Sequence, residues 1–353
     1  MYLEDRKVIP SMIKDLTQRQ RSIKRIIIIT TLFVSLFIVF LIGCSIGKAG
    51  ISFPHVIMAL FHKGDPKEID IVINSRLPRL FLALLVGLGM GAAGVIMQNL
   101  LHNDLASPGT LGVADGSSLF VTLYFAFLST KAIGGPIALP ILALIGGVIS
   151  AFIIYLLGTR KKKPISPTKL IMTGVAMSAF YGAISTFLMY VLDENQLGNL
   201  QRWNAGDISN TIPWMNVLVL FIWISIFFSI TMSYTSTLDV INLGYDTATG
   251  LGVNVKKAFI VLSLLAVGMS SASVAFGGNF FFLGLIGPHI ARRLVGTKTK
   301  YLIPASGAVS SIIIILANIL VENVSIFANI PTGIFVSIIA VPYFLYLLIK
   351  SRW

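Results

Sequence analysis

Long apolar segments alternate with short polar connections along almost the whole chain. A helix needs about 20 apolar residues to cross the hydrocarbon core of a bilayer. By that measure the pattern predicts ten spans, at residues 26–47, 80–101, 110–129, 137–158, 168–191, 213–233, 257–277, 279–293, 304–321 and 331–349. We therefore expect an all-α polytopic membrane protein. Its single ten-helix domain covers residues 26–350, between a cytoplasmic segment, residues 1–25, and a tail, residues 351–353.

Composition and charge support a membrane protein and indicate its orientation. The chain is 56% hydrophobic and 12% charged, whereas soluble domains carry about 25% charged residues. A net charge of +13 would suggest nucleic acid in a soluble protein, but here basic cytoplasmic loops explain it. With both termini inside, 20 Lys and Arg residues fall on the cytoplasmic side and seven outside. We expect an N-in, C-in protein without nucleic acid, and its polar start is too long for a cleavable signal.

The eighth predicted span is unusual, because it carries Gly287-Pro288-His289 and then ends on Arg292 and Arg293. Non-regular backbone at membrane depth survives only inside protein or along a wet cavity. We therefore expect a short, broken span and a translocation function. His289 is expected to be a buried hydrogen-bonding residue rather than an iron ligand, since the four histidines have no metal-ligand spacing.

Two glycine-rich segments look like nucleotide sites but do not have their context. Residues 89–94 match G-x-G-x-x-G within an apolar span, where close helix packing is the better interpretation. Residues 43–48 do not have the spacing of a phosphate-binding loop. The chain is therefore expected to bind no cofactor and to be no enzyme. We also expect Asp193, Glu194 and Asp207 to be solvated in one outside loop, and residues 53–61 to form an interfacial helix.

The segment Phe282 to Arg292, with Leu-Ile-Pro at residues 302–304, resembles a motif of the FecCD-type permeases. These are membrane subunits of ABC importers for iron–siderophores, haem and cobalamin. Residues 98–112, Gln-Asn-x-x-x-Asn-Asp-Leu-Ala-x-Pro-x-x-Leu-Gly, and residues 329–333 match further motifs. The resemblance implies a type II ABC importer permease fold. The residues that it places in structural or translocation motifs are Asn103, Pro108, Gly112, Gly284, Gly287, Pro288, His289, Arg292, Pro331 and Gly333.

The resemblance also implies two contact sites for other proteins. A cytoplasmic loop, residues 234–257, would couple to an ATPase, where a passive loop is the alternative. Arg76 and Arg79 would dock a substrate-binding protein, where interfacial arginines are the alternative. Glu322 stands where the family tends to carry arginine, and Asn318 and Asn329 stand where it tends to carry acids. Either the outer mouth of the permease, where the binding protein docks, is asymmetric in charge, or Glu322 simply faces water. The coupling residues are Leu243, Gly244, Tyr245, Asp246, Ala248, Gly250, Leu251 and Gly252.

These features lead to one functional hypothesis and two alternatives. The hypothesis is a permease subunit of an ATP-driven importer for an iron chelate. It would work with a second permease, two ATPase subunits that bind ATP and Mg, and a substrate-binding protein. The asymmetric mouth slightly favours a heterodimer of permeases. An ion-gradient-driven transporter would need ionisable residues within the spans, and the spans have almost none. No sequence pattern supports a membrane enzyme.

Overall fold

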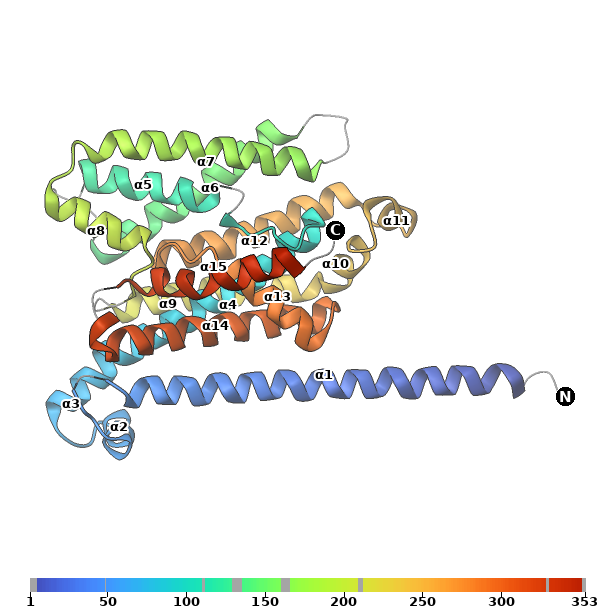
Figure 1. The fold of residues 1–353 in the computed structure, drawn as a ribbon, viewed down its shortest axis with the longest axis horizontal. Helices are drawn as coiled ribbons and strands as arrows, with labels where there is room; N and C mark the ends of the chain where they lie inside the picture. Colours follow the sequence, from blue (N-terminus) through green and yellow to red (C-terminus); the bar gives the residue numbers. More distant parts are fainter. Residues whose placement is uncertain are drawn as a thin grey trace.

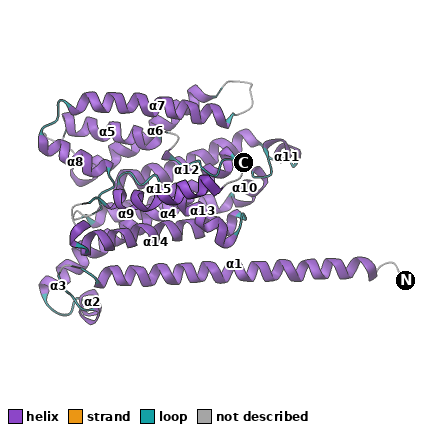
Figure 2. Ribbon diagram, in the orientation of Figure 1, coloured by secondary structure: helices purple, strands orange, loops and turns teal. Residues whose placement is uncertain are grey.

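A computed structural model describes residues 5–47, 49–109, 112–128, 135–159, 166–208, 212–327 and 330–350. All regular secondary structure in these ranges is helical (Figure 2). The elements are α1 (Asp5–Ser45), α2 (Phe53–Leu60), α3 (Pro66–Asp70), the π-helix η1 (Ile71–Arg76), α4 (Leu77–Leu101), α5 (Val113–Phe127), α6 (Gly135–Gly158), α7 (Pro167–Met189), α8 (Glu194–Asn204), α9 (Trp214–Ser233), α10 (Thr235–Ile241), α11 (Tyr245–Gly250), α12 (Val255–Gly277), α13 (Leu283–Val295), α14 (Thr299–Asn323), the short helix η4 (Ser325–Phe327) and α15 (Thr332–Lys350).

Each of the ten predicted spans coincides with a helix of the structure. Seven helical stretches within the described ranges are long and apolar enough to cross a membrane, and they include α1, α4, α6, α7, α9, α12 and α14. Helices α5, α13 and α15 cover the three remaining spans and have shorter apolar stretches. The all-helical class is therefore confirmed, whereas the number of membrane crossings stays a prediction.

The bundle has a buried centre and lipid-accessible flanks. Helices α4, α12 and α14 bury most of their apolar surface, whereas α1, α7 and α9 leave most of it exposed. Figure 1 shows α1 lying along one side of the bundle, next to α14. One end of the bundle holds α2, α3 and α8, and the other holds α10, α11, the start of α1 and the end of α15 (Figure 1). Segments predicted to share one side of the membrane thus lie at the same end.

Small residues allow α4 to approach α13 and α14 closely, which confirms the packing interpretation of residues 89–94. A Cβ atom at Gly91 would lie 2.6 Å from the Ser306 carbonyl oxygen, and one at Gly94 would overlap the Gly284 carbonyl oxygen. Pro288 explains this second contact. It has no N–H to donate to the carbonyl four residues earlier, so the oxygen of Gly284 projects from α13 against the glycine of α4.

We expect a Gly94→Ala substitution to destabilise the bundle by about 1–3 kcal/mol, because the added methyl group must displace backbone rather than a flexible side chain. Heating the detergent-solubilised protein and following its monodisperse fraction measures the effect. Gly182→Ala in α7 is the matched control, since a Cβ there meets no atom within 4 Å. Equal melting temperatures for the two variants would contradict the packing argument.

The predicted break in the eighth span was placed wrongly. Helix α13 continues through Gly287, Pro288 and His289 without interruption, and the non-helical backbone lies before it, at residues 278–282. Gly278 has φ = 84°, a left-handed value that favours glycine. The span is short, as expected, because the chain is not helical until Leu283. The Nε2 atom of His289 is buried without a hydrogen-bond partner among the described residues, so its predicted hydrogen bond at that atom is not found.

Candidate functional site

The predicted coupling loop forms two short helices, α10 and α11, between α9 and α12. Two glycines bracket α11. Gly244 precedes it with φ = 106°, and Gly252 follows it with φ = 85°. Side chains other than glycine rarely adopt these values, so both turns depend on the glycines. The sequence thus separates α11 sharply from α10 and α12.

One face of α11 is anchored to the bundle. The Tyr245 hydroxyl donates a hydrogen bond to the Leu100 carbonyl at the end of α4, and Ala248 is completely buried. The edge of the His102 ring meets the Tyr245 ring, with centroids 4.8 Å apart, and His102 Nε2 bonds the Ile241 carbonyl oxygen at 2.8 Å. Burial raises the pKa of the Tyr245 hydroxyl to about 12. The phenol is therefore protonated near neutral pH and can donate.

The opposite face of α11 is open. Leu243 and Leu251 are 64% and 63% exposed, and Asp246 is also exposed. A Cβ atom at Gly244, Gly250 or Gly252 would meet no other atom within 4 Å. Two exposed leucines, an exposed carboxylate and glycines with open space around them form a surface that another protein can approach closely. We call this surface, formed by Leu243, Asp246, Gly250, Leu251 and Gly252, the α11 face.

Asp239, which none of the sequence motifs includes, connects α10 to the bundle. Its Oδ1 accepts hydrogen bonds from the backbone N–H of Thr299 at 2.8 Å and from its hydroxyl at 2.5 Å. The same hydroxyl accepts from Asn99 Nδ2 at 3.4 Å. A carboxylate at a helix start satisfies N–H groups that have no partner within the helix. The loop is therefore connected to the first residue of α14 and the last turns of α4.

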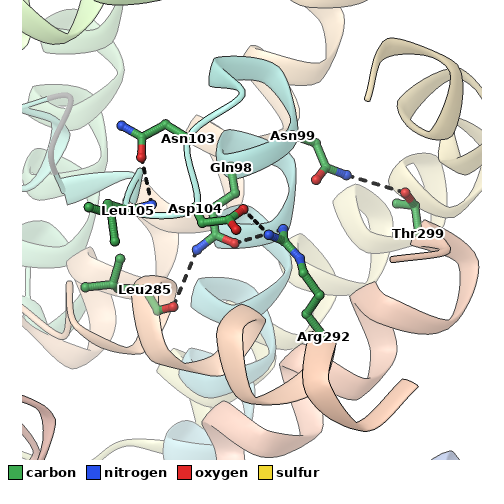
Figure 3. A network of polar contacts seen from close by, with 8 residues as sticks. All are labelled: Gln98, Asn99, Asn103, Asp104, Leu105, Leu285, Arg292 and Thr299. Carbon is green, nitrogen blue, oxygen red and sulfur yellow. Dashed lines mark hydrogen bonds and ion pairs between the residues drawn. The ribbon is translucent and has the colours of Figure 1, made fainter. Parts of the chain in front are cut away.

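The predicted motif residues from α4, the following loop and α13 meet in a polar network (Figure 3). Arg292 forms an ion pair with Asp104, and its Nη2 donates to Gln98 Oε1 at 3.1 Å. Gln98 Nε2 in turn lies 3.4 Å from the Leu285 carbonyl oxygen of α13. The network holds the loop after α4 against α13. Arg292, Gln98 and Asp104 all belong to motifs noted in the sequence, but their contact across two helices was not predicted.

The remaining residues of these motifs shape the same loop. Asn103 Oδ1 accepts from the Leu105 N–H at 2.9 Å, which closes a local turn. Pro108 packs against Gly284, where a Cβ would lie 3.0 Å from its Cδ. Gly112 starts α5 with φ = 70°, and its carbonyl accepts from Ser150 Oγ at 2.8 Å. Each of these residues therefore fixes backbone rather than presenting a reactive group.

At the opposite end, the three predicted docking residues are engaged within the chain. Arg76 is only 4% exposed, and its Nη1 donates to the carbonyls of Cys44 at 2.7 Å and Ser45 at 3.1 Å. Arg79 Nη1 and Glu322 Oε1 form an ion pair of 2.8 Å. Glu322 therefore faces Arg79 instead of water alone. Docking by these residues stays a prediction, and the burial of Arg76 favours a structural role for that side chain.

Pro331 and Gly333 lie at the start of α15 near this end. The Pro331 carbonyl accepts a hydrogen bond from the Ile334 N–H at 3.0 Å. The Gly333 N–H donates to the Gly206 carbonyl at 2.9 Å, and a Cβ on Gly333 would overlap the Ala205 carbonyl oxygen. Asn318 donates from Nδ2 to Thr332 Oγ1 at 3.3 Å, whereas Asn329 lies outside the described residues. The start of α15 is thus held against the end of α8.

Comparison with known proteins gives a consistent result. The model of the FecCD transport family matches residues 35–350. The iron(3+)-hydroxamate import system permease protein FhuG of Bacillus subtilis is 34% identical over 93% of this chain and 98% of its own length. The Fe(3+)-citrate import system permease protein YfmE of the same organism is 34% identical over 95% and 98%.

Among solved structures, an inward-facing metal-chelate type ABC transporter is 27% identical. It matches with a TM-score of 0.79 over 92% of this chain and 99% of that chain. The family model covers nearly all the helices described above, including α4, the loop after it, α11 and α13. The chain therefore belongs to the FecCD transport family and is a multi-pass membrane permease of the ABC-transporter class.

Proposed function

We propose that this chain is the transmembrane subunit of an ATP-driven importer for an iron complex. The observation that carries the proposal is the α11 face, where Leu243 and Leu251 are exposed while Tyr245 and Ala248 anchor the helix from behind. A surface of this kind fits the cleft of an ATPase subunit. The relatives named for iron-hydroxamate and iron-citrate import support an iron complex as the substrate class.

The proposed topology has ten crossings with both termini in the cytoplasm. The excess of Lys and Arg in the segments 1–25, 159–169, 256–257, 292–303 and 350–352 favours this orientation. The end of the bundle that holds α10, α11, the start of α1 and the end of α15 would then face the cytoplasm (Figure 1). The end that holds α2, α3 and α8 would face outside and receive the substrate.

The proposed complex needs partners that supply energy and substrate. Two ATPase subunits would bind ATP and Mg and close around the α11 face of each permease, while this chain binds no cofactor. Motion of α11 would reach α4 through the Tyr245–Leu100 hydrogen bond and α14 through the Asp239–Thr299 contact. A second permease subunit would complete the path, and a binding protein would deliver the iron complex from outside.

We propose that the second permease differs from this chain. The Arg79–Glu322 ion pair and the burial of Arg76 engage both arginines that were expected to meet an acidic lobe of a binding protein. A different permease could supply the missing positive charge, and it would also distinguish the two lobes. Assembly of an active complex from two copies of this chain would eliminate the heterodimer.

Glu322→Ala tests the docking arrangement. Removing the carboxylate frees Arg79 from its ion pair, so we expect an acidic binding protein to bind about two- to fivefold more tightly at low salt, the range of exposed ion pairs. Titration of the binding protein against the purified complex measures the affinity. High salt should reduce the difference, because it weakens the attraction between Arg79 and an acidic partner. Weaker binding by the variant would show that Glu322 itself contacts the partner.

The ATPase contact is tested by co-purification. Leu251→Asp introduces a charge at the centre of the proposed interface, so we expect the ATPase to be lost from the purified complex. Phe61→Asp is the matched control, since Phe61 is 73% exposed at the opposite end of the bundle. Retention of the ATPase by Leu251→Asp at the control level would contradict the assignment of the α11 face.

A further inference from the structure

A cavity lies where the loop after α4 approaches the loop before α13. Its volume is about 230 Å³, and its lining residues are Gly109, Ala114, Asp115, Asn279 and Phe281. Asp115 is the one charged residue among them. None of the contact sites described above uses this cavity or its carboxylate.

Packing places the cavity near the middle of the bundle. A Cβ atom added to Gly284 would lie 3.0 Å from Pro108 Cδ and 3.4 Å from the Met90 carbonyl oxygen. Met90 is close to the centre of α4, which has 25 residues, so either end of that helix is roughly 17–20 Å away at 1.5 Å per residue. A Cβ on Gly109, the residue after Pro108, would lie 2.6 Å from the Phe281 Cβ. The two loops therefore meet beside the middle turns of α4 rather than at either of its ends.

The carboxylate of Asp115 has no hydrogen bond or ion pair among the described residues. It lies in the first turn of α5, and it is only partly buried. The positive end of the helix dipole stabilises an acid at this position, but the structure contains no side-chain capping bond to the helix start. An ionisable residue within a membrane span is costly, and such residues commonly face a pathway. Asp115 is such an acid within the predicted third span.

The other polar group of the cavity also lacks a partner. The Oδ1 atom of Asn279 is buried without a hydrogen bond among the described residues. The ring of Phe281, which lies 4.0 Å from the ring centroid of Phe282, completes the lining. A carboxylate and an amide oxygen accept hydrogen bonds, and an aromatic face attracts cations. All three features favour a positively charged group.

We propose that Asp115, Asn279 and Phe281 form a transient site for a positively charged group, such as an ammonium, on the iron complex that passes through the permease. An ammonium has three N–H donors, enough to reach both the carboxylate and the amide oxygen while its positive charge faces the ring. This inference rests on the proposed transport function and adds a preference for cationic over neutral or anionic chelates. A single, partly exposed carboxylate attracts such a group weakly, which suits a site that must release it.

The charge preference of the cavity can be measured without any chelate. Phe281→Cys provides a thiol in the lining, and the native Cys44 is only 2% exposed, so its background reaction is small. We expect a trimethylammonium thiol reagent to modify this cysteine faster than a sulfonate reagent of similar size. Adding Asp115→Asn should reduce the ratio of the two rates by about tenfold, as loss of a nearby charge implies.

Glu194→Gln is the matched control for this measurement, because Glu194 is an exposed acid at the end of the bundle that holds α8. It should leave the ratio unchanged. Three outcomes would overturn the proposal: an unchanged ratio in Asp115→Asn, an equal fall in Glu194→Gln, or no reaction of the cysteine with either reagent. The last outcome would mean that the cavity is closed to solutes.

Uptake by the complete importer tests the consequence for substrates. Ferrioxamine B carries a free ammonium, and its N-acetyl derivative is the same chelate without that charge. We expect Asp115→Asn to reduce uptake of the charged chelate by about tenfold and to leave the acetylated chelate unaffected. An equal loss for both would assign Asp115 a structural role and overturn the proposal. If the wild-type complex imports no iron chelate, the proposed function fails. The reaction rates of Phe281→Cys with the two thiol reagents would still show whether the cavity prefers cations.

Discussion

Replacing Gly250 with tryptophan should abolish transport while the protein still inserts and the ATPase still hydrolyses ATP. Gly250 lies in α11 without a left-handed φ, and a Cβ there meets no atom within 4 Å. The variant therefore changes the α11 face without disturbing the fold of this chain. A bulky ring would hold the ATPase away from the backbone and uncouple hydrolysis from motion of α11. Iron uptake and ATP hydrolysis are measured together on the reconstituted complex.

Gly250→Ala is the control, since a methyl group adds little bulk and alanine favours helix formation. It should transport at the wild-type rate. Gly252→Trp should also abolish transport, but it is less informative because Gly252 has φ = 85° and any side chain strains the turn. Normal transport by Gly250→Trp would show that no partner approaches this part of the α11 face.

Cysteines placed at the two ends of the bundle should react from opposite sides of the membrane. We expect Leu251→Cys to be labelled by an impermeant reagent only from the cytoplasm and Phe61→Cys only from outside, because α11 and α2 lie at opposite ends (Figure 1). Both native side chains are well exposed, at 63% and 73%. Labelling of intact cells and of inverted vesicles gives the comparison.

Each cysteine is expected to be labelled from one side of the membrane only. Tyr245 would be a poor reporter, since its ring packs against His102 and its hydroxyl bonds the Leu100 carbonyl. Labelling of Leu251→Cys from outside would overturn both the N-in topology and the ATPase contact.

Hydrophobic pattern predicted the helices well because burial in lipid and in the bundle both require apolar side chains. It missed the helical residues before α4, since the stretch Pro66–Arg76 is too polar to extend the predicted span. It also missed α8, which was expected to be a solvated loop. The sequence did contain a signal there: Asp193 and Gln196 form a capping box at the start of α8.

The polar sites were harder to predict because their partners are distant in the sequence. Asp239 bonds Thr299 across 60 residues, and Asp104 pairs with Arg292 across 188. Pro288 was expected to break its span, yet α13 continues through it, and Gly94 of α4 leaves room for the Gly284 carbonyl that has lost its helical hydrogen bond. Local rules predict the lost hydrogen bond, whereas only the packed bundle shows which neighbour the free carbonyl meets.

The central claim is that ATP hydrolysis by ATPase subunits bound at the α11 face drives uptake of an iron complex through this chain. The most direct measurement is uptake into proteoliposomes that contain this permease with its partner permease and ATPases, supplied with the binding protein and an iron chelate. The account predicts uptake that requires ATP on the side of the membrane where the ATPase subunits lie. This uptake should continue when ionophores collapse every ion gradient. Uptake that proceeds without ATP and stops with the ionophores would identify an ion-gradient-driven transporter and contradict the account.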